Sequence, residues 1–344
     1  MPQLIPRPEL ERTLVRELEK TPLLVLAGAR GSGKTTLLSA LARRWQGATA
    51  LVQLDPIACT PEVLHDELTR LAEPVLESTN RAARGKSTLK SLCSALRKRR
   101  PDSLLLLDDI TEVRTLASYP DVDKPLEGVL EALGRSNQAC IATTRFGYWL
   151  RQHFPEIPIL WVPPLTISEL SDAGVADAGL MAAATEGRAV HVSHLAGRGD
   201  VATALAEELA TGGGIEAECR ATMAELLHRA RGYGACKSVL RVLAHEQGLN
   251  LTEVSRRLDR TPGSTRDYLR WLEEVDLLVV REKRFFYVDT VLRLWVRIYW
   301  QGVVPTEGDV RREVEVHLAA SHVEPVEETY TFPVANSEDL VEID

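Results

Sequence analysis

Short apolar runs alternate with segments of helical period over the first half of the chain. The apolar runs predict strands at residues 23–27, 50–54, 103–107, 139–143 and 157–162. The segments between them predict helices at residues 35–45, 61–73, 87–99 and 126–133. Uninterrupted apolar strands separated by helices are typical of a parallel sheet that is covered on both faces. We therefore expect an α/β fold whose sheet ends before Pro163 and Pro164.

The second half of the chain changes to a mainly helical pattern. Residues 167–230 are rich in alanine and have helical period, which predicts a small helical lid after a first domain of residues 1–166. Residues 231–300 predict helices followed by two short strands, and form a third domain. Residues 301–344 contain three prolines and little helical signal beyond residues 310–319, so we expect an acidic C-terminal tail with partial disorder.

The composition is ordinary for a folded soluble protein, with 44% hydrophobic and 26% charged residues. No apolar run approaches the ~18 residues that a membrane span requires, and the N-terminus lacks the pattern of a secretion signal. We therefore expect no membrane partner. Five scattered cysteines without a CxxC pair favour reduced thiols and a cytoplasmic location.

Charge is distributed unevenly between the last two segments. Residues 231–300 carry 13 Lys and Arg against 9 Asp and Glu, a net charge of +4. Residues 301–344 carry 2 against 11, a net charge of −9. The simplest explanation is two solvated surfaces of opposite sign. The alternative hypothesis is that the acidic tail lies over the basic segment as an autoinhibitor.

A phosphate-binding loop follows the first predicted strand and precedes the first predicted helix. It matches G-x-x-x-x-G-K-[ST] at every specified position, with Thr36 following, through Gly28, Ala29, Arg30, Gly31, Ser32, Gly33, Lys34 and Thr35. The glycines allow successive backbone N–H groups to face one concavity, toward which the helix directs its positive end. Lys34 would bridge the β- and γ-phosphates, and the Thr35 hydroxyl would hold Mg²⁺. This loop predicts binding of ATP, ADP and Mg²⁺.

Polar residues end two later strands. Asp108 would hold Mg²⁺ through water, and Asp109 would orient or deprotonate the attacking water, although both residues would also serve as simple strand caps. Thr143, Thr144 and Arg145 end the next strand, where Arg145 would contact the γ-phosphate or would only be solvated. Because Asp109 is shorter than the glutamate common in fast ATPases, we expect slow hydrolysis.

These motifs, in this order and spacing, resemble the STAND branch of the AAA+-related ATPases, which includes the archaeal-type ATPases. Two further segments are similar to that branch. By resemblance, residues 5–10, which include Arg7, pack over the adenine, and residues 164–170 form the linker to the lid. The chain has Pro6 where the family usually has glycine, and Ala189 where it often has proline. The resemblance covers about residues 4–300.

The resemblance implies a switch in which ADP holds a closed form and exchange for ATP permits opening and assembly. Such a switch requires contacts with the γ-phosphate that differ between its two forms. Lys34, Arg145 and a basic residue of the lid or of the third domain are the candidates for these contacts.

The third domain is predicted to be a winged helix. Its helices are expected at residues 251–258, with Thr252 as N-cap, and 264–274, and its hairpin strands at 277–280 and 285–288. Six residues of the second helix and the hairpin would face outward and contact double-stranded DNA: Thr265, Arg266, Arg270, Arg281, Lys283 and Arg284. The alternatives are a latch on the ATPase core and a docking surface for a protein partner.

Two other functional classes are alternatives to the switch. A ring- or filament-forming AAA+ motor or loader, of the initiator or transposition-regulator kind, requires an arginine finger, for which Arg151 is the candidate. A non-catalytic transcription regulator would use nucleotide only to stabilise its fold. His191 and His194 are interpreted as core or surface residues of the lid, and the basic residues within 81–100 as a solvated helix face.

Overall fold

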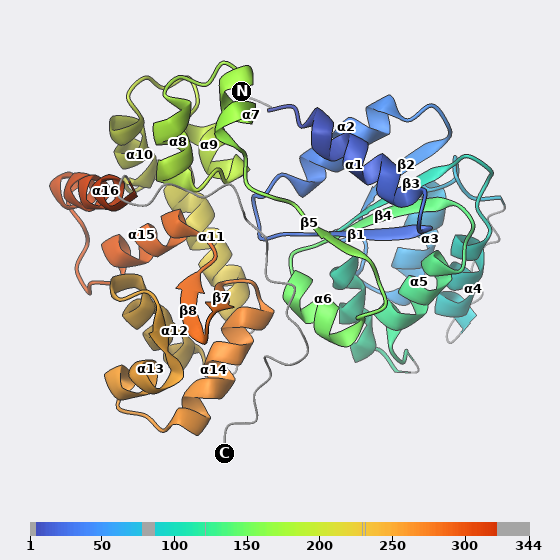
Figure 1. Cartoon of the computed structure of the whole chain (residues 1–344). Helices are drawn as coiled ribbons and strands as arrows, with labels where there is room; N and C mark the ends of the chain where they lie inside the picture. The colour runs from blue at the N-terminus through green and yellow to red at the C-terminus, as the bar shows by residue number, and fades with distance from the viewer. Residues whose placement is uncertain (1–4, 78–86, 121, 229, 231, 322–344) are drawn as a thin grey trace. The chain divides into compact units, whose positions relative to one another are not determined.

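A computed structural model of the chain describes residues 5–77, 87–120, 122–228, 230 and 232–321 (Figure 1). The described chain divides into two compact units after Val162. The first unit contains residues 6–162, and the second contains Ile5 and the residues from Pro163 onward. Of the helices in these described ranges, none has both the length and the apolar character needed to cross a lipid bilayer.

The first unit is built on a parallel sheet of five strands in the order β2-β3-β4-β1-β5. The strands are β1 (Leu23–Ala27), β2 (Thr49–Gln53), β3 (Leu104–Asp108), β4 (Ala139–Thr144) and β5 (Ile159–Trp161). The predicted α/β fold with a parallel sheet is confirmed. In register, Ala27 lies opposite Thr144, and Gln53 lies opposite Asp108. The carboxyl ends of these strands therefore meet at one edge of the sheet.

Helices cover both faces of this sheet (Figure 1), as the apolar strands predict. Leu24 and Leu104 pack on one face with α1 and α2, whereas Val25 and Leu105 pack on the other with α3, α4 and α5. This alternation follows from the two-residue period of a strand. The helices are α1 (Pro8–Leu18), α2 (Lys34–Arg44), α3 (Pro61–Leu71), α4 (Ser87–Arg97) and α5 (Pro125–Gly134).

α1 was not predicted as a helix, and neither were two further segments of the first unit, η1 (Ile110–Ser118), a 3₁₀-helix, and α6 (Gly147–His153). Both η1 and α6 follow a strand that ends in polar residues. The start of α6 requires glycine, because a Cβ at Gly147 would lie 2.5 Å from the Cβ of Ala27 and 2.4 Å from the ring of Trp161. Gly147 thereby lets α6 begin in contact with the ends of β1 and β5.

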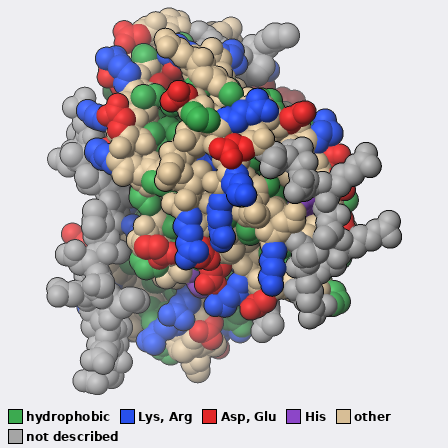
Figure 2. Space-filling view, turned by 90° about the vertical axis from the view of Figure 1, so that its right-hand side faces the viewer, with side chains coloured by type: hydrophobic (Ala, Val, Ile, Leu, Met, Phe, Trp, Pro, Cys, Tyr) green, Lys and Arg blue, Asp and Glu red, His purple; other side chains and the backbone are tan. Residues whose placement is uncertain are grey.

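The basic residues near α4 are only partly a solvated helix face. Lys90, Arg97 and Lys98 are exposed, and Figure 2 shows Lys and Arg side chains interspersed with Asp and Glu on the face that includes α4. Arg99 differs, because it is 3% exposed and donates hydrogen bonds to the Ser136 hydroxyl and to the carbonyls of Gln138 and Ala139 at the start of β4. Arg99 therefore joins α4 to β4 rather than contacting solvent.

The second unit begins with a group of helices that continues past residue 230. These are α7 (Ile167–Asp172), α8 (Ala178–Thr185), α9 (Ala189–Leu195), α10 (Val201–Leu209), α11 (Gly214–His228) and α12 (Tyr233–His245). The segment before α7 is fixed by a hydrogen bond of 2.7 Å from the Leu165 amide to the Gly187 carbonyl. A Cβ at Gly187 would lie 2.2 Å from the Leu165 carbonyl oxygen, so this close approach requires glycine.

A small antiparallel sheet with the strand order β6-β8-β7 follows α12. Two helices separate its first strand from the other two, so the order along the chain is β6 (Leu249–Asn250), α13 (Leu251–Leu258), α14 (Pro262–Glu274), β7 (Leu278–Arg281) and β8 (Arg284–Tyr287). Glu282 and Lys283 both have positive φ, as a two-residue hairpin turn requires. The N-cap of α13 is Asn250, which forms a capping box with Glu253, so the prediction of Thr252 was wrong.

The predicted helical signal in the acidic C-terminal segment corresponds to α16 (Glu307–Ser321), which follows α15 (Thr290–Tyr299). Val310, Val314 and Leu318 of α16 are buried, and the His317 imidazole lies 2.9 Å from the Ala184 carbonyl oxygen. A truncation that tests the autoinhibitor hypothesis must therefore begin after Ser321. We expected partial disorder in residues 301–344, but residues 307–321 form a helix, and residues 322–344 lie outside the described residues.

Candidate active site

The loop between β1 and α2 has the backbone conformation that its glycines permit. Gly31 and Gly33 have φ values of +76° and +92°, which side chains other than glycine rarely allow. A Cβ at Gly28 would lie 2.8 Å from the Ser32 hydroxyl. Gly33 directly precedes α2, whose first turn contains no acidic residue. This helix terminus is therefore suited to an anion.

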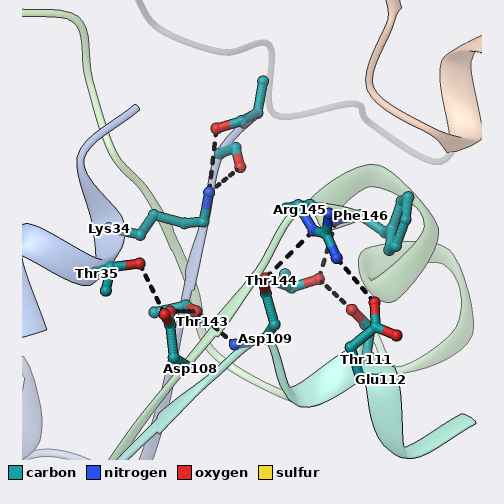
Figure 3. Close-up of polar contacts among 12 residues, drawn as sticks. Lys34, Thr35, Asp108, Asp109, Thr111, Glu112, Thr143, Thr144, Arg145 and Phe146 are labelled. Atoms are coloured by element: carbon teal, nitrogen blue, oxygen red, sulfur yellow. Dashed lines mark hydrogen bonds and ion pairs between the residues drawn. The ribbon is translucent and has the colours of Figure 1, made fainter. Parts of the chain in front are cut away.

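Lys34 lies over this loop with its ammonium group among backbone carbonyls (Figure 3). Its Nζ donates hydrogen bonds to the carbonyl oxygens of Gly28 at 2.6 Å and Ala29 at 3.1 Å. The residue is only 6% exposed. The loop thus holds a buried positive charge beside the helix terminus, where a phosphate group would gain both interactions.

Thr35 and Asp108, the two residues predicted to hold Mg²⁺, are in direct contact. The Thr35 hydroxyl donates a hydrogen bond of 2.7 Å to one carboxylate oxygen of Asp108, and the Thr143 hydroxyl donates one of 2.6 Å to the other (Figure 3). Hydroxyl and carboxylate oxygens are ligands that Mg²⁺ prefers. The donor set of α2 and β3 therefore fits a magnesium ion, with Thr143 of β4 orienting the carboxylate.

Asp109 lies next to this contact and faces Arg145 of the following strand end. Its backbone is in the left-handed region, with φ of +58°, and its amide donates a hydrogen bond of 2.9 Å to the Thr143 hydroxyl. The Arg145 Nε lies 3.5 Å from the Asp109 carboxylate. Burial raises the pKa of Asp109, whereas the nearby Arg145 opposes that rise.

Arg145 also contacts a carboxylate that was not predicted, that of Glu112 in η1. The Arg145 Nη2 donates a hydrogen bond of 2.9 Å to the Glu112 Oε1 (Figure 3). Glu112 is 5% exposed, and the Arg145 side chain is 14% exposed. The sequence offers little signal for Glu112, which lies in a segment where apolar residues recur only at every third position, Ile110, Val113 and Leu116.

The other predicted residues of this site lie on the loop, at the start of α2, before α1 and on α6. Arg30 and Thr36 are exposed at the loop and at the start of α2. Arg7 directly precedes α1 and is half-buried. Arg151, the candidate arginine finger, lies on α6, where its guanidinium is 5.8 Å from the ring centre of Tyr148. The structure thus brings the loop, Asp108, Asp109 and Arg145 together.

Five of the six predicted DNA-contact residues are exposed on α14 and the following hairpin, namely Arg266, Arg270, Arg281, Lys283 and Arg284. The prediction that Thr265 faces outward was wrong. Thr265 is 0% exposed, and its hydroxyl donates a hydrogen bond of 3.0 Å to the Thr261 carbonyl. Thr265 lies four residues before Leu269 and seven before Leu272, so the helical period places it on the same buried face of α14.

The two histidines of α9, His191 and His194, lie close to carboxylates inside the second unit. The His191 Nε2 lies 2.9 Å from Asp289, and the His194 Nδ1 lies 3.4 Å from Glu208. Asp289 also caps α15 and forms an ion pair of 3.0 Å with Arg188. Burial would raise the pKa of Asp289, but the positive charge of Arg188 and the contacts with His191 and the Leu292 amide hold it far below its usual range.

Glu186 lies close to this ionic group and titrates abnormally. Burial raises its pKa from 4.5 to about 7, although Arg188 opposes the rise. Asp289 adds to the rise, and Arg281 and Arg293 oppose it more weakly than Arg188 does. The ionised Glu186 carboxylate is therefore a source of instability near neutral pH.

Replacing Glu186 with glutamine is expected to stabilise the chain at alkaline pH. Because the folded chain holds this proton more tightly than the unfolded one, stability falls as pH rises from 4.5 to about 7. At pH 8 the variant should unfold with a free energy up to about 3 kcal/mol higher than the wild type, and near pH 4 the two should agree. Urea unfolding at both pH values measures this, with Glu207→Gln, an exposed site, as control. Equal stability at pH 8 would contradict the expectation.

Comparisons with known proteins give a family and a shared fold. A model of the family described as novel STAND NTPase 1 matches residues 5–198. The structure of a Walker-type ATPase of Pyrococcus abyssi is similar with a TM-score of 0.67, at 17% identity, over 86% of this chain and 96% of that chain. This likeness shows a shared fold.

Weaker similarity extends to a STAND protein with a tetratricopeptide repeat sensor from Pyrococcus horikoshii. That match has a TM-score of 0.36 and 13% identity, over 93% of this chain and 45% of that chain. At so low a TM-score it adds nothing to the fold argument. Among curated proteins, no sequence matches the chain.

Proposed function

Because the chain belongs to the novel STAND NTPase 1 family, we propose that it is an ATP-dependent switch with slow hydrolysis. The family match covers more than half of the chain, and confirms the resemblance to STAND ATPases that the sequence predicts. The chain is therefore a P-loop NTPase. The observation that carries the proposal is the contact of Thr35, Asp108 and Thr143 beside the glycine loop.

The loop would bind the phosphates of ATP and ADP through its backbone amides and the terminus of α2. Lys34 would exchange its carbonyl partners for oxygens of the β- and γ-phosphates, and Arg7 would lie near the adenine. Thr35 and Asp108 would hold Mg²⁺, which supplies positive charge to the phosphate oxygens when bound. Arg30 and Ser32 of the same loop, and Thr36 in the first turn of α2, would complete the nucleotide-binding residues.

Hydrolysis would depend on Asp109, which would orient a water molecule toward the γ-phosphate. Its pairing with Arg145 at 3.5 Å leaves the carboxylate partly neutralised. Arg145 would in turn contact the γ-phosphate, which ATP has and ADP lacks. A contact made with only one of the two nucleotides is what a switch requires. These features favour slow ATP hydrolysis. The state of the switch would then depend on whether ATP or ADP is bound, and not on the rate of hydrolysis.

The output of the switch would be assembly together with binding of double-stranded DNA. The arrangement of α13, α14 and the β7–β8 hairpin supports a winged helix in residues 231–300, which would follow a lid in residues 167–230. Its exposed arginines on α14, Arg266 and Arg270, would contact the phosphate backbone, together with Arg281, Lys283 and Arg284 at the hairpin.

The DNA-binding part of the proposal is tested by fluorescence anisotropy of a labelled duplex with the full chain. We expect tighter binding with ATPγS and Mg²⁺ than with ADP. The variant Arg266→Glu with Arg270→Glu should lose about tenfold in affinity and show a weaker dependence on salt. The control is Arg311→Glu, an exposed arginine of α16, which should bind as the wild type does.

An unchanged affinity in the double variant would reject DNA contact by α14. If the same variant instead released ADP faster, α14 would act as a latch. A requirement for Arg151 in rapid, assembly-stimulated hydrolysis would favour the motor or loader over the switch.

A further inference from the structure

Glu112 is a buried carboxylate to which the proposed reaction gives no role. It lies three residues after Asp109, at the start of η1, and its Oε1 accepts the 2.9 Å hydrogen bond from Arg145 (Figure 3). Charged side chains are seldom this buried unless they are paired. The pairing of Glu112 with Arg145 is therefore a feature that needs an explanation.

Arg145 is shared between two carboxylates that have different positions in the site. Its Nε faces Asp109 at 3.5 Å, and its Nη2 faces Glu112. A guanidinium has several donors in a fixed plane, so one arginine can hold two acids at once. If Arg145 moved toward a phosphate, the Glu112 carboxylate would remain buried without its cation, which is energetically unfavourable.

We propose that Glu112 is a positioning residue that holds Arg145 against Asp109 and competes with the γ-phosphate of ATP for that arginine. This inference rests on the proposed function. ADP lacks the γ-phosphate and leaves the Arg145–Glu112 pair intact, so Glu112 lowers the affinity for ATP alone. It thereby biases the chain toward the ADP-bound form and keeps the Asp109 carboxylate paired.

A purely structural role for Glu112 makes a different prediction. In that case the ion pair only fixes η1 to the end of β4, and its loss disturbs the site for every nucleotide. ATP and ADP would then lose affinity by similar factors. The ratio of the two affinities therefore distinguishes competition for Arg145 from simple support of the fold.

The test is to measure ATPγS and ADP affinities of the full chain with Mg²⁺, for the wild type and Glu112→Gln. We expect about a tenfold gain for ATPγS, as for one charge-assisted hydrogen bond, and no change for ADP. The matched control is Glu11→Gln. Glu11 is also 5% exposed and paired with an arginine, Arg44 of α2, but does not contact Arg145. Both affinities should be unchanged in this control.

A double-mutant cycle with Arg145→Ala makes the test specific. In that background Glu112→Gln should have no further effect on the affinity for ATPγS, because the arginine for which they compete is absent. The inference is overturned if Glu112→Gln leaves the ATPγS to ADP ratio unchanged or if its gain persists without Arg145. If the wild type binds neither nucleotide, the proposed function fails and the inference fails with it.

Discussion

Replacing Lys34 with alanine is expected to lower the affinity for ATP by about 100-fold and that for ADP by about tenfold. Lys34 would form charge-assisted hydrogen bonds to both the β- and the γ-phosphate, each contributing about 1.5–3 kcal/mol. ADP offers only the β-phosphate, so it loses less. The buried ammonium group over the loop, bonded to the Gly28 and Ala29 carbonyls, is already close to the terminus of α2.

Isothermal titration with ATPγS and ADP measures both affinities of the Lys34 variant. Lys20→Ala is the control, because Lys20 is an exposed lysine paired with Glu17 outside the loop. An unchanged melting temperature of the variant shows that the loss concerns binding rather than folding. Nucleotide affinity that survives the loss of Lys34 would contradict the assignment of this loop as the phosphate site.

Replacing Asp109 with asparagine is expected to reduce ATP hydrolysis by about 100-fold or more while ATP binding is retained. An amide has no charge and cannot accept a proton from the attacking water, and general-base catalysis typically contributes factors of that size. The side chain would keep its shape beside Arg145 and Thr143. ATP-dependent assembly should therefore persist or increase in this variant, because the ATP-bound form is no longer depleted.

Phosphate release and ATPγS affinity measured side by side test this expectation, with Asp66→Asn on the exposed face of α3 as control. The wild-type rate should fall on acidification at a higher pH than an ordinary aspartate would give, because burial raises the Asp109 pKa and the protonated acid is inactive. Loss of assembly together with hydrolysis would favour a motor, and indifference to the substitution would favour a regulator stabilised by nucleotide.

The central sheet could be predicted closely because its signal is local. β1, β3 and β4 are buried on both faces, so each is an uninterrupted apolar run bounded by polar residues. η1, α6 and β6 were missed because each is short, and because tertiary contacts rather than sequence period define them. α1 was also missed, because Leu14 is the single buried apolar residue among its eleven. The tight approach of Gly147 to Ala27 and Trp161 is one such contact.

The candidate site likewise contains residues with a local sequence signal and residues that only tertiary contacts bring together. The glycine loop and the aspartates at the end of β3 could be predicted because consecutive residues carry the pattern, and parallel strands bring their ends together. The pairing of Glu112 with Arg145 joins residues 33 positions apart and has no periodic signal. Thr265 was misplaced although the helical period puts it on the face of Leu269 and Leu272, because a polar residue type was taken to indicate exposure. Its buried hydroxyl is instead satisfied within α14 by the Thr261 carbonyl.

The switch itself is tested most directly by the nucleotide retained after gentle purification and by the mass of the full chain in ADP and in ATP with Mg²⁺. The account predicts tightly held ADP, a monomer in ADP, and a larger assembly in ATP. An empty site with rapid exchange and one unchanged mass would contradict the switch, and would leave a simple ATPase or regulator in its place.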